Sequence, residues 1–308
     1  MLTFYKLDKQ FTQLYEWEPN CWVNVSKPNA EEIRFLEDTL GLPEYFLSDI
    51  GDEDERARID HEDGWMMIII RIAFRKNTPS RSPYVTVPLG ILLKGDKLIT
   101  VCHHETAMMR DVVSYQTRRN RGFIDSTDFV VRLFLSSAVW FLKYLRQIEG
   151  IIDESKRELD RPVDNKDLVR LSRLQDSLTY FATSIRNNEM LLAKLKFKLP
   201  VDELDKELIE DVNIELSQAR ETTSIYNNIL ASTLETYSSV INNNMNNVMK
   251  LLTTLNMILM LPTLVSSIFG MNLVNHMEEW SYGFYFVIGS MFLITILLIL
   301  FFKKRHWL

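Results

Sequence analysis

A stripe of small polar side chains and methionines follows one face of a long uncharged segment near the end of the chain. Its members recur at alternating spacings of three and four residues, the spacing of one face of an α-helix. They are Asn246, Met249, Thr253, Asn256, Met260, Thr263, Ser267 and Gly270. The other positions are mostly leucine, isoleucine and valine. We therefore expect a helix with one polar face in apolar surroundings.

Amide, hydroxyl and carbonyl oxygens in this pattern suit recognition of a hard, hydrated cation. Mg²⁺ prefers oxygen ligands and loses its water reluctantly, so neutral oxygens can bind its hydration shell without trapping the ion. Methionine and leucine levels would supply apolar constrictions that close by dewetting. Several copies of the helix around an axis would turn each residue into a ring. Such residues also line ordinary contacts between membrane helices, so the stripe alone leaves pore lining and helix packing as equal alternatives.

Two segments are long enough to cross a bilayer, and the first of them contains most of this stripe. Residues 251–277 and 280–302 contain no Asp, Glu, Lys or Arg, and about 20 helical residues cross the hydrocarbon core. A basic run, 303–305, follows the second segment, whereas the linker between the segments contains Glu278 and Glu279 and no basic residue. The start of the chain has no signal-peptide pattern. The positive-inside rule then predicts cytoplasmic termini and an extracytoplasmic linker.

Composition narrows the function classes. A net charge of −6 disfavours nucleic-acid binding and is compatible with attracting cations. The two cysteines, Cys21 and Cys102, form no CxxC pair, which suits a cytosolic domain, and Cys102 lies in an apolar run and is expected to be buried. No phosphate-binding loop, nucleophile triad or zinc-spaced Cys/His set occurs, so we expect no enzyme and no organic cofactor.

Glycine and proline divide the charged part of the chain into a mixed first half and a helical second half. Seven of ten glycines lie in the first 150 residues, whereas 151–269 has none. Apolar, β-branched runs at 65–74, 84–93 and 97–102 predict strands. Asn29, followed by acidic residues, predicts the start of a helix that continues to about Leu40. An α/β domain over the first 120 residues is the expectation.

Three long helices are predicted in the second half. The first two are expected from about Ser126 to Leu159 and from Asp164 to Leu199. The third starts after Pro200, has apolar residues every three or four positions, and meets no breaker before the first span. If it continues to Gly270, about 70 residues give a rod of roughly 105 Å. Such a rod would couple a cytoplasmic domain to the membrane; the alternative is a helical bundle with a separate membrane anchor.

Two further groups of metal-ligating residue types occur in the first half. The acidic run 52–55, with Asp60, His61, Glu62 and Asp63, could hold a metal, but such runs are more often solvated loops. His103 and His104 are adjacent and point apart on any regular element, so they do not predict a shared metal ion.

The first span ends in Gly270-Met271-Asn272, and here the sequence resembles the CorA family of magnesium and divalent metal-ion transporters. The signature of that family is Gly-Met-Asn at the end of the first of two C-terminal spans. The resemblance also includes residues 246–250 (NNVMK), Pro262-Thr263, the short outer linker, the tail 303–308 (KKRHWL) and, more loosely, 56–71 and 126–149.

The resemblance implies an α+β/α membrane protein: an N-terminal α/β cytoplasmic domain, a long helical stalk and two C-terminal transmembrane helices, assembled as a funnel-shaped homopentamer in the cell membrane. It implies that Gly270, Met271 and Asn272 form an outer selectivity filter. The family's pore-facing positions fall on Asn246, Leu252, Asn256, Met260 and Thr263, to which the stripe adds Ser267. Of these, Leu252 and Met260 would form the apolar constriction.

The resemblance also places Asp211 at a stalk carboxylate that, in the family, binds regulatory Mg²⁺ between subunits. A solvated helix charge is the equal alternative, and the sequence does not identify a partner for Asp211. The outer loop departs from the family's Met-Pro-Glu-Leu, because this chain has Met-Glu-Glu-Trp at 277–280. Either Glu278 or Glu279 corresponds to the acidic residue of the family loop, and the other is an additional acidic residue.

Together these features predict a passive, membrane-potential-driven Mg²⁺ influx channel, gated by intracellular Mg²⁺. A divalent ion crossing 100 mV gains about 4.6 kcal/mol, so no ATP is needed. The expected partners are further copies of the chain, divalent cations and the lipid bilayer, and not nucleic acid. The predicted parts are a cytoplasmic α/β domain (1–120), a cytoplasmic helical bundle with the stalk helix (121–250) and a pore-lining transmembrane helix (251–272). An extracytoplasmic loop (273–281), a second transmembrane helix (282–302) and a basic cytoplasmic tail (303–308) follow. The alternatives are a zinc or cobalt/nickel transporter on the same scaffold, and a non-transporting, membrane-anchored helical scaffold.

Overall fold

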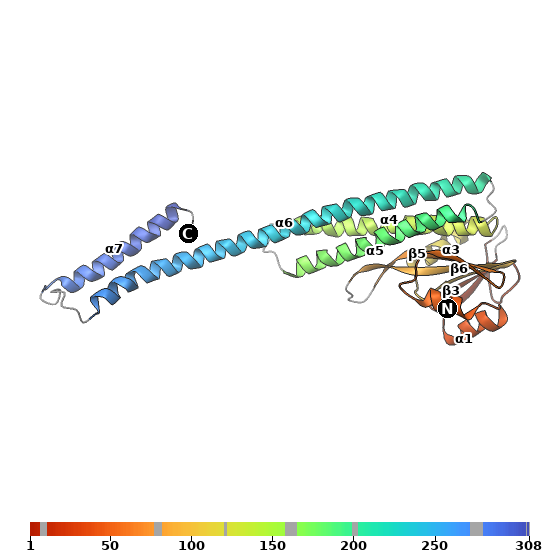
Figure 1. Cartoon of the computed structure of the whole chain (residues 1–308), viewed down its shortest axis with the longest axis horizontal. Coiled ribbons are helices and arrows are strands. Elements are labelled where there is room, and N and C mark those ends of the chain that lie inside the picture. The colour runs from red at the N-terminus through yellow and green to blue at the C-terminus, as the bar shows by residue number, and fades with distance from the viewer. Residues whose placement is uncertain are drawn as a thin grey trace. The chain divides into compact units, whose positions relative to one another are not determined.

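The structure is a computed structural model that describes residues 1–6, 11–76, 82–119, 122–157, 165–198, 203–271, 280–305 and 307. The chain divides into two units, Met1–Leu234 and Glu235–Leu308 (Figure 1). The long helix α6 (Glu203–Phe269) contributes residues to both units.

A seven-stranded sheet forms the centre of the first unit. Its strands are β1 (Leu2–Lys6), β2 (Gln13–Leu14), β3 (Cys21–Ser26), β4 (Arg58–Glu62), β5 (Trp65–Arg75), β6 (Tyr84–Lys94) and β7 (Lys97–Cys102). Their order is β2-β1-β3-β7-β6-β5-β4, and every neighbouring pair is antiparallel except β3 and β7. The three predicted strands are confirmed as β5, β6 and β7. Their continuous apolar runs fit a sheet that is covered on both faces.

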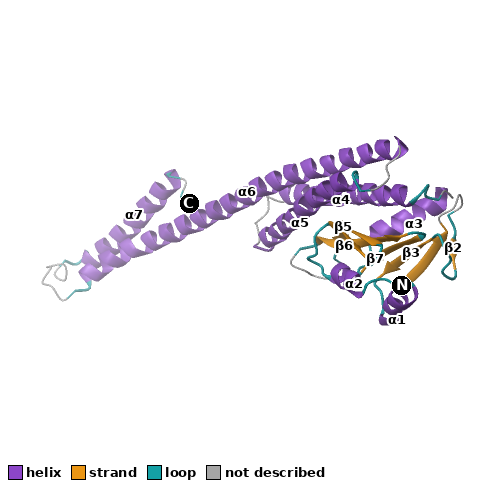
Figure 2. Ribbon diagram, turned by 45° about the vertical axis from the view of Figure 1, so that its right-hand side comes forward, coloured by secondary structure: helices purple, strands orange, loops and turns teal. Residues whose placement is uncertain are grey.

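Helices cover the two faces of this sheet (Figure 2). On one face lie α1 (Ala30–Arg34), the π-helical turn η1 (Phe35–Thr39) and α2 (Glu44–Gly51). Buried side chains of η1 and α2 share a core with β3, β5, β6 and β7, and the partly buried Ile33 of α1 packs against it. On the other face lie α4 (Ser126–Arg157) and α5 (Asn165–Leu195), which contact β5 and β6. A further helix, α3 (Ala107–Arg119), packs beside α4. The predicted α/β character of this part of the chain is confirmed.

The predicted helix start at Asn29 is confirmed as a capping box. The Asn29 side chain accepts a hydrogen bond from the amide of Glu32 at 2.8 Å, and the Glu32 carboxylate accepts one from the amide of Asn29 at 3.0 Å. The helix does not continue regularly to Leu40, as predicted, because it widens into η1. Gly41, at φ +72°, then ends it, and the amide of Leu42 bonds back to the carbonyl of Leu36.

The three predicted long helices are confirmed as α4, α5 and α6. Both ends of each helix lie within four residues of the predicted positions. Within the first unit, α6 buries Ile209, Val212 and Leu216, and Arg220 forms an ion pair with Glu189 of α5 at 3.1 Å. The apolar spacing read from the sequence therefore marks the face by which this part of α6 packs.

A buried polar junction joins the sheet to the helical layer. Asn188 of α5 accepts a hydrogen bond from the backbone amide of Arg71 at 2.9 Å and donates one to its carbonyl at 2.7 Å. Arg71 pairs in register with Pro88, which has no amide hydrogen, and lies beyond Arg58, the first residue of β4, in the ladder. A side chain therefore completes the hydrogen bonding of this backbone position, which keeps a buried amide and carbonyl from being left unpaired.

The side chain of Arg71 ties the acidic loop after α2 to the same junction. Its guanidinium donates to the carbonyls of Glu53 at 2.6 Å and Glu55 at 2.9 Å, and to the carbonyl of Thr86 at 2.6 Å. Burial lowers the pKa of Arg71, and the carboxylates of the loop, Asp54 first, oppose that shift. The acidic run at 52–55 thus balances a buried cation in the fold.

We expect the Asn188→Leu substitution to destabilise the first unit by about 2–4 kcal/mol, because a buried backbone amide and carbonyl each lose their partner. The measurement is thermal unfolding of the full-length protein, followed by near-ultraviolet circular dichroism. The matched control is Asn187→Leu at the half-buried neighbouring position. Equal unfolding temperatures for the two variants would contradict this role of Asn188.

Candidate functional site

The second unit is built from the end of α6 and from α7 (Gly283–Lys304). Among the described residues, the helices at Lys206–Phe269 and Gly283–Lys304 contain stretches long and apolar enough to cross a membrane, and hardly any of either stretch is buried inside the protein. Exposed leucine, isoleucine and phenylalanine over most of their surface suit contact with lipid. Figures 1 and 2 both show α7 alongside the last part of α6.

The helix α7 covers only one face of α6. Thr254 is fully buried, and Ile258, Pro262 and Val265 are half-buried, whereas most other positions of this stretch are exposed. On α7 the less exposed positions also repeat every three or four residues: Gly283, Val287, Ser290, Met291, Ile294, Thr295, Leu298 and Phe302. These two rows are the surfaces by which the helices pack within one chain.

The polar stripe lies on the face of α6 that α7 leaves open. At about 100° per residue, Asn256, Met260, Thr263 and Ser267 fall roughly 180–240° around the helix from Thr254. All four are exposed, and Met260 is 72% exposed. Leu252 also belongs to this open face and is 52% exposed. Packing between the two spans of one chain therefore does not account for the stripe. Of the two alternatives for the stripe, pore lining and helix packing, the second now requires packing between different chains.

Hydroxyl geometry on α6 determines what the stripe offers to an ion. The Thr263 hydroxyl donates its proton to the carbonyl of Leu259 at 2.7 Å. Its oxygen therefore presents lone pairs outward and can accept a hydrogen bond. Water molecules bound to a divalent cation point their hydrogens away from the ion, so they need acceptors of this kind. Asn246, exposed at the other end of the stripe, offers an amide oxygen with the same property.

The predicted filter lies at the point where α6 ends. The helix stops at Phe269, and the amide of Gly270 still bonds to the carbonyl of Ser266 at 2.9 Å. A Cβ at Gly270 would approach that carbonyl oxygen to 3.2 Å, a tight contact that glycine avoids. Met271 is exposed. The other predicted filter residue, Asn272, and the two acidic residues Glu278 and Glu279 lie outside the described residues.

Asp211 is exposed on α6 within the first unit. The described part of the chain contains no group of three or more His, Cys, Asp or Glu side chains arranged to hold a metal ion.

Several of the other metal candidates from the sequence have structural partners, but one histidine in the described part of the chain does not. Arg58 pairs with Asp49 and Glu55, and His104 lies 3.2 Å from a carboxylate oxygen of Glu53. The Nε2 atom of His103 is buried and has no hydrogen-bond partner among the described residues. Burial and, to a smaller extent, the neighbouring His104 lower the pKa of His103.

Both cysteines are buried, as predicted for Cys102. Burial raises the pKa of Cys102 to about 12 and also raises that of Cys21. Burial and a raised pKa both disfavour the reactive thiolate form at neutral pH, so we expect slow reaction of either thiol with thiol reagents.

Sequence reasoning missed the residues that hold the soluble unit together. Asn188 and Arg71 are 117 positions apart, and no local pattern links them. A single asparagine on the buried face of a predicted helix was the only available signal, since such a side chain needs a partner.

Fold and site together define a two-span membrane protein whose first span continues a long helix of a soluble α/β unit and exposes a polar face. The sequence profile of the family described as "CorA-like Mg2+ transporter protein" matches residues 17–304. The chain belongs to this family, as its Gly-Met-Asn segment predicted. It is a family of transporters and not of enzymes.

Named relatives and solved structures agree with this membership. The chain is 32% identical over 309 residues to the magnesium transport protein CorA of Wolinella succinogenes, covering 93% of this chain and 91% of the relative. It is 25% identical over 297 residues to the cobalt/magnesium transport protein CorA of Methanocaldococcus jannaschii, with coverages of 93% and 91%. The complete structure of the CorA magnesium transporter from that archaeon superposes with a TM-score of 0.82 at 21% identity, over 100% of this chain and 99% of that one.

We expect a cysteine at Thr263 to react with a charged, membrane-impermeant thiol reagent on the order of tenfold faster than a cysteine at Thr254, because reactivity follows exposure to water. Thr263→Cys lies on the open face of α6, and Thr254→Cys lies under α7. The labelling rate is measured on the assembled protein in liposomes, with the natural chain as the background. Equal rates at the two positions would show that the stripe does not face water.

Proposed function

We propose that this protein is a passive channel that admits Mg²⁺ into the cell, driven by the membrane potential and gated by intracellular Mg²⁺. The observation that carries the proposal is the open polar face of α6, on which hydroxyl and amide oxygens alternate with apolar levels. Rings of such acceptors around an axis suit a hydrated divalent cation. Family membership and the names of the relatives support Mg²⁺ as the ion.

The pore requires several copies of the chain, and we propose a homopentamer. The filter would consist of Gly270, Met271 and Asn272, with Glu278 and Glu279 concentrating cations at the outer mouth. Asn246, Asn256, Thr263 and Ser267 would supply oxygen rings along the pore. Leu252 and Met260, both more than half exposed in the single chain, would form the apolar gate between those rings.

Asp211 is proposed as a ligand of regulatory Mg²⁺ between subunits. Its exposure on α6 leaves the carboxylate available to a neighbouring copy. When cytosolic Mg²⁺ falls, the emptied site would leave like charges facing one another, and their repulsion would separate the stalks. Because α6 runs without interruption from Glu203 to Phe269, the displacement would reach the Leu252–Met260 levels along one helix.

The proposed location is the cell membrane, with both termini in the cytoplasm. The basic residues 303–305 lie at the end of α7, and the linker between the spans has two glutamates and no basic residue. Cobalt is a second ion to test, because the Methanocaldococcus jannaschii relative is named as a cobalt/magnesium transport protein.

We expect the purified protein in liposomes to conduct Mg²⁺ when an inside-negative potential is applied, with no requirement for a pH gradient. Asn272→Ala is expected to abolish this flux, since each subunit would lose its outer amide ligand. Fluorescent indicators inside the liposomes measure the uptake of Mg²⁺, Co²⁺ and Zn²⁺ in parallel. Uptake of Zn²⁺ that depends on a pH gradient, without Mg²⁺ uptake, would favour the zinc alternative. Absence of flux for every ion would favour the scaffold.

We expect Asp211→Lys to raise the internal Mg²⁺ concentration that half-inhibits the channel by on the order of tenfold, which corresponds to about 1.4 kcal/mol of binding free energy. The control is Glu210→Lys, which makes the same charge change at the exposed neighbouring position, about 100° around the helix. Inhibition is measured as patch current against internal Mg²⁺. An unchanged response of Asp211→Lys would remove Asp211 from the regulatory site.

A further inference from the structure

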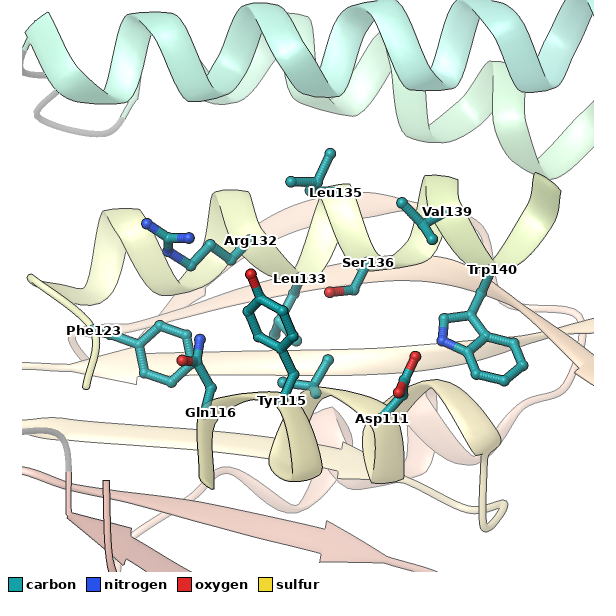
Figure 3. Close-up of a pocket in the computed structure, with 11 residues that line it drawn as sticks. Asp111, Tyr115, Gln116, Phe123, Arg132, Leu133, Leu135, Ser136, Val139 and Trp140 are labelled. Carbon is teal, nitrogen blue, oxygen red and sulfur yellow. The ribbon is translucent and has the colours of Figure 1, made fainter. Parts of the chain in front are cut away.

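A cleft of about 260 Å³ separates α3 from α4 in the first unit, and the transport proposal gives it no role (Figure 3). Its walls carry three aromatic side chains, Tyr115, Phe123 and Trp140. Four aliphatic residues of α3 and α4 also line it, together with Ser136, one amide and two charged side chains. Aromatic walls with a few polar groups are typical of sites that bind small molecules.

Gln116 is the polar group that distinguishes this cleft from a packing gap. It is 6% exposed and lines the cleft, yet no described residue forms a hydrogen bond with its carboxamide. Its apolar neighbours in the lining, Val112 and Leu133, are buried and offer no side-chain partner. Its amide atoms are not among the fully buried atoms of the described residues that lack a partner, so they reach the water of the cleft, and a donor and an acceptor remain for a ligand.

The charged residues of the cleft are already paired. Asp111 accepts a hydrogen bond from Lys143 at 2.7 Å, and Nε of Arg132 donates to Asp128 at 2.7 Å. The remaining nitrogens of the Arg132 guanidinium lie at the rim, where its side chain is 36% exposed. The interior therefore suits an uncharged ring, and the rim suits an attached anionic group.

The side chains are arranged from one end of the cleft to the other. Gln116, Phe123 and Arg132 lie toward one end, and Asp111 and Trp140 lie toward the opposite end (Figure 3). An anionic group beside Arg132 would thus stay away from the Asp111 carboxylate.

We propose that this cleft binds a purine nucleotide. The Gln116 carboxamide presents one donor and one acceptor side by side, the pair that matches N7 and the exocyclic amine of adenine. Tyr115 and Phe123 supply ring surfaces of the kind on which bases stack. Arg132 meets the phosphate at the rim. An apolar ligand would leave the amide unpaired.

The test is equilibrium dialysis of the purified full-length protein with adenosine and with AMP. Adenosine binds at one site per chain, and Gln116→Leu, which keeps the volume and removes both polar groups, weakens binding on the order of tenfold or more. The control Gln218→Leu, at an exposed position on α6, leaves binding unchanged. Ser136→Trp fills the cleft from α4 and abolishes binding, independently of any effect on Gln116.

Two further measurements distinguish recognition of the base from recognition of the phosphate, and specific binding from non-specific binding of any apolar ring. AMP binds more tightly than adenosine at low salt, and the difference shrinks at high salt because the phosphate contact is at the rim. AMP binding without adenosine binding would mean that only phosphate is recognised, which overturns the proposal. The proposal also fails if adenosine shows no saturable binding at millimolar concentration, or if indole binds as tightly as adenosine and Gln116→Leu changes neither.

Discussion

Polar side chains in the middle of a hydrocarbon layer need partners, and this constraint governs the second unit. Asn256 and Ser267 cannot face lipid without losing hydrogen bonds to water, which is costly in a medium that offers none, whereas the Thr263 hydroxyl already donates to the carbonyl of Leu259 in its own helix. The helix α7 does not shelter them, because it packs over Thr254 on the other side of α6. A single chain therefore leaves its own requirement unmet. Only further copies or enclosed water can meet it, and both are supplied when several open faces surround one axis.

The soluble unit meets the corresponding requirement within one chain. At Arg71 the β-ladder cannot complete the backbone hydrogen bonds, and Asn188 from a distant helix does so. The guanidinium of Arg71 holds the loop that follows α2 by donating hydrogen bonds to two of its backbone carbonyls. One position thus connects the sheet, the helical layer and an acidic loop, which makes this part of the fold resistant to independent movement of its layers.

Local patterns were sufficient for the elements that are apolar over many residues. β5, β6 and β7 were readable because both faces of each strand are buried, and α4 to α6 because their packing faces repeat with helical spacing. β4 was missed because its sequence, RIDHE, is that of a polar edge strand. β3 was missed because Asn24 interrupts its apolar run; the structure shows that Thr3 and Thr100 lie beside it in a hydrogen-bonded row. These contacts join separate strands, so no local window contains them.

The stripe itself could also be predicted from the sequence, but which positions of α6 are covered by α7 could not. Thr253 and Thr254 are neighbours of the same type, and only the packing of the second helix distinguishes the half-exposed one from the buried one. The regulatory role proposed for Asp211 would depend on a contact between chains, which neither the sequence nor a single chain contains.

The contrast between the two spans bears on how the protein is made. During synthesis the first span leaves the ribosome before the second, and its amide and hydroxyl groups reduce its preference for lipid over the translocation channel. The second span is almost wholly apolar and is followed at once by three basic residues, which the positive-inside rule favours on the cytoplasmic side. We expect α7 to drive insertion and to draw its predecessor into the bilayer as one helical hairpin. In this view the apolar second helix is what allows its neighbour to be polar.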